Sequence, residues 1–257
     1  MGFLSKLFGS KDDDSANTFA SHVAEGTPVS SAPKTVVIDM SKSKENLNKV
    51  LIDMSKGAKI DMTKHTARVA LAMDYSGSMS NLYDNGSVQD VITRLLPIAL
   101  RFDDNGELES WLFSNDQERL KAVTESNYET YVKKVMRKAK MDMGGTNYAP
   151  VLRNMITYYK DIEPSEIPAF IIFITDGENW DTKATNEIIR ELSKYNMFVQ
   201  FIGIGNENFR YLRELDNLEG RIHDNTGFTA VKDMNKMTDE ELYTEILRQY
   251  KDWLNDK

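Results

Sequence analysis

Three continuous apolar runs constrain the fold of this chain more than any other feature. They read ARVALAM at 67–73, PAFIIFIT at 168–175 and MFVQFIGI at 197–204. Strands that are apolar on both faces are typical of parallel sheets covered by helices on both sides. Because amphipathic segments separate these runs, we predict an α/β domain with a doubly wound, mainly parallel sheet and right-handed crossovers.

The segments around these runs complete the predicted order of elements. Apolar residues at helical spacing predict helices over 88–100, where Pro97 should kink or shorten the helix, and over 127–140, 149–161, 184–195 and 208–215. The alternating run 107–113 predicts an exposed or edge strand, and 119–123 and 221–223 read as short strands. Thr238 with Glu241 forms a capping box that predicts the start of a last helix.

Oxygen-bearing side chains recur directly beside the predicted strands. In an open α/β sheet, ligands bind outside the carboxyl ends of the strands, where the strand order reverses. The sequence DYSGS follows the first apolar run, MGGTNY precedes the helix at 149, and TDG ends the run at 168–175. Alternate spacing allows the acid and both serines of DYSGS to point the same way. We therefore expect five side chains to converge at this edge: Asp74, Ser76, Ser78, Thr146 and Asp176.

Carboxylates and hydroxyls without nitrogen or sulfur donors favour a hard divalent cation, namely magnesium, manganese or calcium. Uncompensated, Asp74 and Asp176 would repel each other, and a cation would turn this repulsion into attraction. The sequence therefore predicts one divalent cation with a coordination position left open.

These motifs resemble the metal-ion-dependent adhesion site of the von Willebrand factor A (VWA) family. DYSGS matches its Asp-x-Ser-x-Ser motif, GGT supplies its threonine and TDG its second aspartate, in the same order, and the resemblance covers residues 66–254. It implies a Rossmann-like VWA fold. It further implies that Ser76, Ser78 and Thr146 bind the ion directly, that Asp74 and Asp176 act through water, and that an acidic group of a protein partner fills the open position.

Three further acids lie near these motifs and depart from the pattern. Asp142 precedes GGT, and Glu178 and Asp181 follow Asp176. They either strengthen cation binding or repel an acidic partner; the alternative is that they are solvated loop acids.

The segment before the α/β domain divides into two predicted parts. Residues 1–33 read as a flexible N-terminal segment, in which residues 3–8 place Phe3, Leu4, Leu7 and Phe8 on one face of a short amphipathic helix. Such a helix would dock on a membrane surface or a partner, and a frayed terminus is the alternative. The α/β domain itself is expected over 65–257.

Residues 34–64 repeat one short motif, as IDMSK, IDMSK and IDMTK. The alternation of apolar and polar residues, with Gly57 between the last two copies, predicts a β-hairpin appendage. The hairpin resembles the opening of the tellurium-resistance (TerD-type) domain. Because a lone hairpin is barely stable in water, its apolar residues should pack against the α/β domain, namely Ile52, Met54, Ile60 and Met62.

Composition excludes several classes of function. The net charge of −8, without a basic cluster, argues against nucleic-acid binding, and the absence of cysteine excludes disulfides and thiol chemistry. No apolar run approaches the roughly 20 residues of a membrane span. No secretory signal is recognised, which favours a cytoplasmic protein over a secreted adhesin.

Together these features predict a metal-dependent protein-binding module that acts in the assembly of a tellurium-resistance or related stress-response system, and not an enzyme. The alternative is a metal-dependent phosphoryl-transfer or hydrolytic enzyme that uses the same carboxylates. The sequence contains no G-x-S-x-G elbow and no P-loop. A serine triad would need a histidine at the Ser76 loop, but His22 lies in the N-terminal segment, His65 precedes the first predicted strand and His223 lies far along the chain.

Overall fold

The computed structural model describes residues 38–177, 179–233 and 236–257. The N-terminal segment 1–33 and its amphipathic stretch 3–8 lie outside these residues, as does Glu178. The flexible segment, its amphipathic helix and the role of Glu178 therefore stay predictions.

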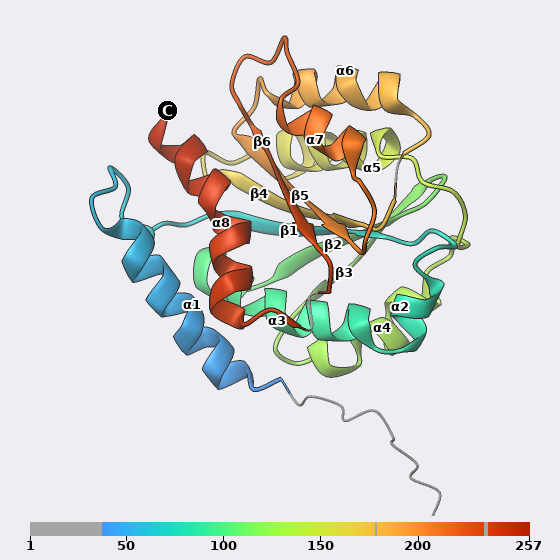
Figure 1. Ribbon diagram of the computed structural model, residues 1–257, viewed down its shortest axis with the longest axis horizontal. Helices are drawn as coiled ribbons and strands as arrows, with labels where there is room; N and C mark the ends of the chain where they lie inside the picture. Colours follow the sequence, from blue (N-terminus) through green and yellow to red (C-terminus); the bar gives the residue numbers. More distant parts are fainter. Residues whose placement is uncertain (1–37, 178, 234–235) are drawn as a thin grey trace, which may run out of the picture. The chain divides into compact units, whose positions relative to one another are not determined.

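A six-stranded sheet forms the centre of the described chain, with the strand order β3-β2-β1-β4-β5-β6 (Figure 1). Only β3 is antiparallel to its neighbour, and the other pairings are parallel. This confirms the predicted doubly wound, mainly parallel sheet. The strands are β1 Arg68–Asp74, β2 Leu108–Phe113, β3 Gln117–Val123, β4 Ala169–Thr175, β5 Met197–Ile204 and β6 Thr226–Val231.

The strand order reverses between β1 and β4. From β1 the chain adds β2 and β3 on one side, and then returns to add β4, β5 and β6 on the other. Met73 pairs with Ile174, so Asp74 and Thr175 end their strands side by side. The run 107–113, predicted as an exposed or edge strand, forms the inner strand β2, and β3 takes the edge.

Helices cover both faces of the sheet (Figure 1). One core packs α1, α3 and α8 against the sheet, and the other packs α5, α6 and α7 against its opposite face. The helices are α1 Met40–Ser55, α2 Ser80–Asp84, α3 Ser87–Phe102, α4 Tyr131–Lys134, α5 Ala149–Thr157, α6 Thr182–Leu192, α7 Arg210–Asp216 and α8 Asp239–Asn255. Short 3-10 helices lie at Tyr128–Thr130 and Met136–Lys138, and a π-helix at Tyr158–Ile162 continues α5.

Two predicted helices differ from expectation, the first in part. Helix α3 continues through Pro97, so the expected shortening is wrong, and the expected kink stays a prediction. The predicted helix over 127–140 breaks into short pieces. Tyr131 and Met136 would face different sides of a regular helix, yet both are fully buried, and the break lets both reach the core. The capping box of Thr238 and Glu241 at α8 is confirmed.

The β-hairpin predicted over 34–64 is wrong for the described residues, because 40–55 form helix α1. Asp39 caps this helix by accepting hydrogen bonds from the backbone N–H groups of Ser41 at 2.9 Å and Lys42 at 3.4 Å. Leu47 and Leu51, four residues apart on one helix face, are almost completely buried. This helical spacing outweighs the two-residue alternation of the repeated motif.

Because this segment is a helix, the four apolar side chains that were expected to pack from a hairpin against the α/β domain are buried to different extents. Met62 is fully buried, and Met54 and Ile60 are partly buried against the core. Ile52, however, points away from the core and is 53% exposed. Three of the four residues thus pack as expected, but from a helix and the turn that follows it.

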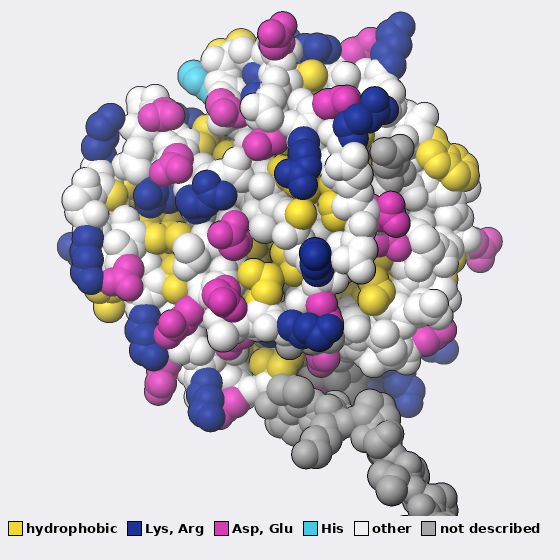
Figure 2. Space-filling model, viewed as in Figure 1, with side chains coloured by type: hydrophobic (Ala, Val, Ile, Leu, Met, Phe, Trp, Pro, Cys, Tyr) yellow, Lys and Arg dark blue, Asp and Glu magenta, His cyan; other side chains and the backbone are white. Residues whose placement is uncertain are grey.

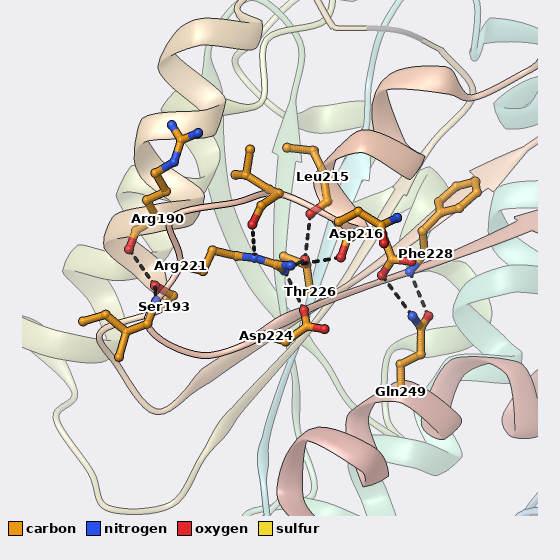
Figure 3. Close-up of polar contacts among 12 residues, drawn as sticks. Arg190, Ser193, Leu215, Asp216, Arg221, Asp224, Thr226, Phe228 and Gln249 are labelled. Carbon is orange, nitrogen blue, oxygen red and sulfur yellow. Dashed lines mark hydrogen bonds and ion pairs between the residues drawn. The ribbon is translucent and has the colours of Figure 1, made fainter. Parts of the chain in front are cut away.

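The last strand is β6, and the strand predicted at 221–223 is wrong. Arg221 instead holds the loop before β6 in place (Figure 3). Its guanidinium donates to the carbonyl oxygens of Leu218 at 2.7 Å and Asp216 at 3.1 Å, and to Thr226 at the start of β6. A charged side chain with these partners stabilises a loop conformation and not a strand.

The surface shows no segregation of charge on the face drawn in Figure 2, where Lys and Arg side chains alternate with Asp and Glu. A hollow of about 1280 Å³ lies between α1, β6 and α8, and Ile52, Ala230 and Glu245 are among its lining residues. None of the five predicted site residues lines it. No helix in the described part of the chain combines the length and the hydropathy that a membrane span requires.

Candidate functional site

Asp74 ends β1 with a carboxylate that is fully buried. Its Oδ1 accepts a hydrogen bond from the backbone N–H of Ser76 at 2.7 Å, and its Oδ2 accepts one from Thr175 Oγ1 at 2.6 Å. Both oxygens are therefore held by neighbouring polar groups, one from its own loop and one from the end of β4.

A chain of hydroxyl contacts connects this loop to the second aspartate. Ser76 Oγ lies 3.0 Å from Ser78 Oγ, and Ser78 Oγ donates to Asp176 Oδ1 at 2.9 Å. Because Ser78 has a single hydroxyl proton, Ser76 is the donor in the first contact. The structure thus brings four of the five predicted side chains together, with Asp74 and Ser76 buried and Ser78 exposed.

Thr146 is brought to the same edge by its backbone. Ser76 and Gly144 form an isolated parallel bridge, and Gly77 donates its N–H to the carbonyl oxygen of Gly144 at 3.0 Å. Thr146 lies two residues further on and is 7% exposed. The loop that carries Thr146 therefore runs beside the loop that carries both serines.

Two glycines allow this loop to approach its neighbours closely. A Cβ atom on Gly144 would lie 2.7 Å from Asn115 Nδ2, and one on Gly145 would lie 2.4 Å from Trp180 Cζ3. Asn115 also accepts the N–H of Gly145 through Oδ1 at 3.0 Å. Sequence reasoning missed Asn115, whose position after β2 becomes relevant only when the strand order is known.

Tyr148 is a second residue that the sequence did not point out. Its hydroxyl donates to the carbonyl oxygen of Gly177 at 2.8 Å and lies 3.3 Å from Thr175 Oγ1. Since Thr175 in turn donates to Asp74, Tyr148 supports both aspartate-bearing loops from its position directly before α5. The side chain is fully buried.

Of the three additional acids, the two in the described residues have different environments. Asp181 is not a solvated acid: it caps α5 by accepting from the backbone N–H groups of Tyr148 at 3.0 Å and Ala149 at 2.9 Å. Asp142 is exposed, as expected for a loop acid. Glu178 lies outside the described residues.

Burial and the nearby charge of Asp176 make ionisation of the Asp74 carboxyl costly. Burial raises the pKa of the Asp74 carboxyl to about 6, and the charge of Asp176 adds to the rise, while hydrogen bonds from Thr175 and Ser76 oppose it. Burial also raises the pKa of Asp176 above its ordinary value. Among the described residues, neither carboxylate forms an ion pair with a basic side chain.

This donor set fits a hard divalent cation. Two carboxylates and three hydroxyls lie at one sheet edge, where added positive charge would relieve the repulsion between Asp74 and Asp176. Within the described ranges, no three His, Asp or Glu side chains gather as an alternative metal site. A cation at this edge would therefore depend on the hydroxyls as well as the acids.

Comparison with known protein sequences gives a family and a relative. Residues 66–257 match the family described as "vWA found in TerF C terminus". The chain is also 42% identical over 200 residues to the protein named "Uncharacterized protein YcbR" of Bacillus subtilis (strain 168), which covers 77% of this chain and 82% of that protein.

Solved structures with this fold include three VWA proteins of low sequence identity. Proximal thread matrix protein 1 from the mussel byssus, with a zinc-occupied adhesion motif, has a TM-score of 0.53 at 17% identity, over 73% of this chain but 46% of that chain. Manganese-loaded TRAP protein of Plasmodium vivax has 0.51 at 17%, over 72% and 73%. The SpRpn10 VWA domain has 0.50 at 12%, over 69% and 93%. At these identities the similarity shows the fold.

Proposed function

This chain belongs to the VWA family, as a member of the TerF-like group, and from that premise we propose that it is a metal-dependent protein-binding module. VWA domains are commonly protein-interaction modules that act through a bound metal. The observation that carries the proposal is the hydrogen-bonded series from Asp74 through Ser76 and Ser78 to Asp176 at the reversal of strand order.

The residues take the roles that their chemistry allows. Ser76, Ser78 and Thr146 would hold the ion directly, and Asp74 and Asp176 would support it through water. The ion would supply the positive charge that draws an acidic side chain of a protein partner. Magnesium, manganese or calcium suits these oxygen donors.

Asp74 also argues for binding over catalysis. A hydrolytic or phosphoryl-transfer enzyme that used this carboxylate as a base would need it within reach of the substrate or an attacking water. Asp74 is fully buried and both of its oxygens accept hydrogen bonds from the protein. This environment favours a role in supporting the ion.

The cellular role we propose is assembly of a tellurium-resistance or related stress-response system in the cytoplasm. It is supported by the TerF name of the matching family. Chemistry on tellurite itself is not proposed, because the chain has no cysteine thiol to act as a reductant.

Calorimetric titration of the full chain with magnesium, manganese and calcium chlorides tests this proposal. We expect one ion to bind, and Asp74→Ala to abolish the binding. Asp142→Ala is the matched control, since Asp142 is an exposed acid close in sequence to Thr146 and should leave the affinity unchanged. Absence of a binding heat for all three ions, together with an unchanged melting temperature, would refute the proposal.

A further inference from the structure

Trp180 is exposed beside the candidate metal site. The chain has three tryptophans, and Trp180 is 75% exposed, whereas Trp111 and Trp253 are buried. A single exposed apolar residue is ordinary on a protein surface. Trp180 differs from such a residue because it lies next to the candidate metal site and contacts the loop that carries Thr146.

The backbone and ring of Trp180 are fixed against the loop that carries Thr146. Its N–H donates to the carbonyl oxygen of Thr146 at 2.9 Å. Its ring lies against Gly145, at a distance that leaves no space for a Cβ atom on that residue. A ring that already packs against the protein on one side loses less conformational freedom when a partner covers the other side.

The residues on either side of Trp180 hold the surrounding segment in place. Asn179 is buried and donates through Nδ2 to Asp181 Oδ1 and Thr185 Oγ1, both at 2.8 Å. Asp181 in turn caps α5. Asn179 and Asp181 therefore hold this segment in place, while the ring of Trp180 stays open to solvent.

We propose that Trp180 is an apolar anchor for the partner that binds the metal, and that this partner presents an acidic residue with an apolar side chain one or two positions away. This inference rests on the proposed function, because the acidic residue would coordinate the ion. An aromatic residue next to a polar contact is the typical composition of an interaction hot spot.

An apolar side chain next to the coordinating acid gains free energy by covering the ring of Trp180. The partner segment is therefore acidic and apolar.

A peptide library tests this directly. The probe is a phage library of random nine-residue peptides with aspartate or glutamate fixed at the centre, selected on the full wild-type chain in manganese and eluted with chelator. We expect apolar residues to be enriched next to the fixed acid. The selected peptides should bind Trp180→Ala about tenfold more weakly, while Trp180→Phe should keep most of the affinity.

Two controls separate this inference from the proposed function. Manganese affinity should be unchanged in Trp180→Ala, and Ile222→Ala, which removes another exposed apolar side chain before β6, should leave peptide affinity unchanged. Selected acids without apolar neighbours, equal affinity for Trp180→Ala, or no chelator-sensitive peptide on a chain that does bind manganese would each overturn the inference. Failure of the wild-type chain to bind manganese would overturn the proposed function and this inference with it.

Discussion

Asp74 illustrates at the residue scale how the site depends on a cation. Its carboxyl group ionises with a pKa of about 6 because it is buried, and the ordinary value is 3.8. The folded state therefore binds this proton more tightly than the unfolded state. The resulting cost is absent below about pH 4, grows as the pH rises through the folded pKa, and is complete above it.

Replacement of this charge should stabilise the metal-free protein. Asp74→Asn keeps the shape and one acceptor oxygen, and we expect it to raise the free energy of unfolding by about 1–2 kcal/mol at pH 8 in chelator. At pH 4.5, where wild-type Asp74 is mostly protonated, the gain should shrink. Urea unfolding at both pH values measures this. A variant less stable than wild type at pH 8 would contradict the explanation that the buried charge of Asp74 destabilises the metal-free protein.

Tyr148 should influence metal affinity without touching the metal. Tyr148→Phe removes the hydroxyl that donates to Gly177 and should weaken metal binding by about tenfold, as supporting residues of metal sites commonly do. Tyr243→Phe is the matched control, because its buried hydroxyl donates to the carbonyl oxygen of Arg94, on the opposite face of the sheet. Both variants should lose about 1 kcal/mol of stability. Equal metal affinities in titration calorimetry would rule out this role.

At the residue scale, the sequence indicates some residues of the site and not others. The positions of Asp74, Ser76 and Ser78 follow from local spacing after an apolar run, so they could be predicted to lie together. Asn115 and Trp180 support or flank the same edge through the approach of distant loops, which depends on strand order and close packing at Gly145. No local pattern carries that information.

At the scale of elements, the repeated motif adopts three environments. The first copy spans the cap and start of α1, the second spans its end, and the third forms the turn after it. This short motif thus has no fixed conformation of its own. Burial of Leu47 and Leu51 at helical spacing decides for a helix, and tertiary packing overrides the alternating pattern.

Two neighbouring substitutions distinguish this helix from the hairpin. Leu51 is fully buried and Ile52 is 53% exposed, whereas a hairpin would bury Ile52 with Met54 and turn Leu51 outward. We expect Leu51→Ala to cost about 2–4 kcal/mol of stability and Ile52→Ala well under about 1 kcal/mol. Chemical denaturation of the two variants measures both, and a reversed order would favour the hairpin.

At the scale of the whole molecule, the sequence predicts the central strands β1, β4 and β5 better than the edge strand β6. β1, β4 and β5 are continuous apolar runs because both of their faces are covered, which is the property that periodicity detects. β6 at the edge reads TGFTAV and lacks such a run, so periodicity does not indicate it. The candidate site was predictable because it lies at the ends of the central strands.

The central claim is that one divalent cation binds among Asp74, Ser76, Ser78, Thr146 and Asp176. Crystals of the full chain grown with manganese chloride test it most directly, through the anomalous difference map. The account predicts a single strong peak within coordinating distance of the hydroxyl oxygens of Ser76, Ser78 and Thr146, and no peak there in crystals of Asp74→Ala. A map with no peak at this edge, or with the manganese bound at other acids such as Asp142, would contradict it.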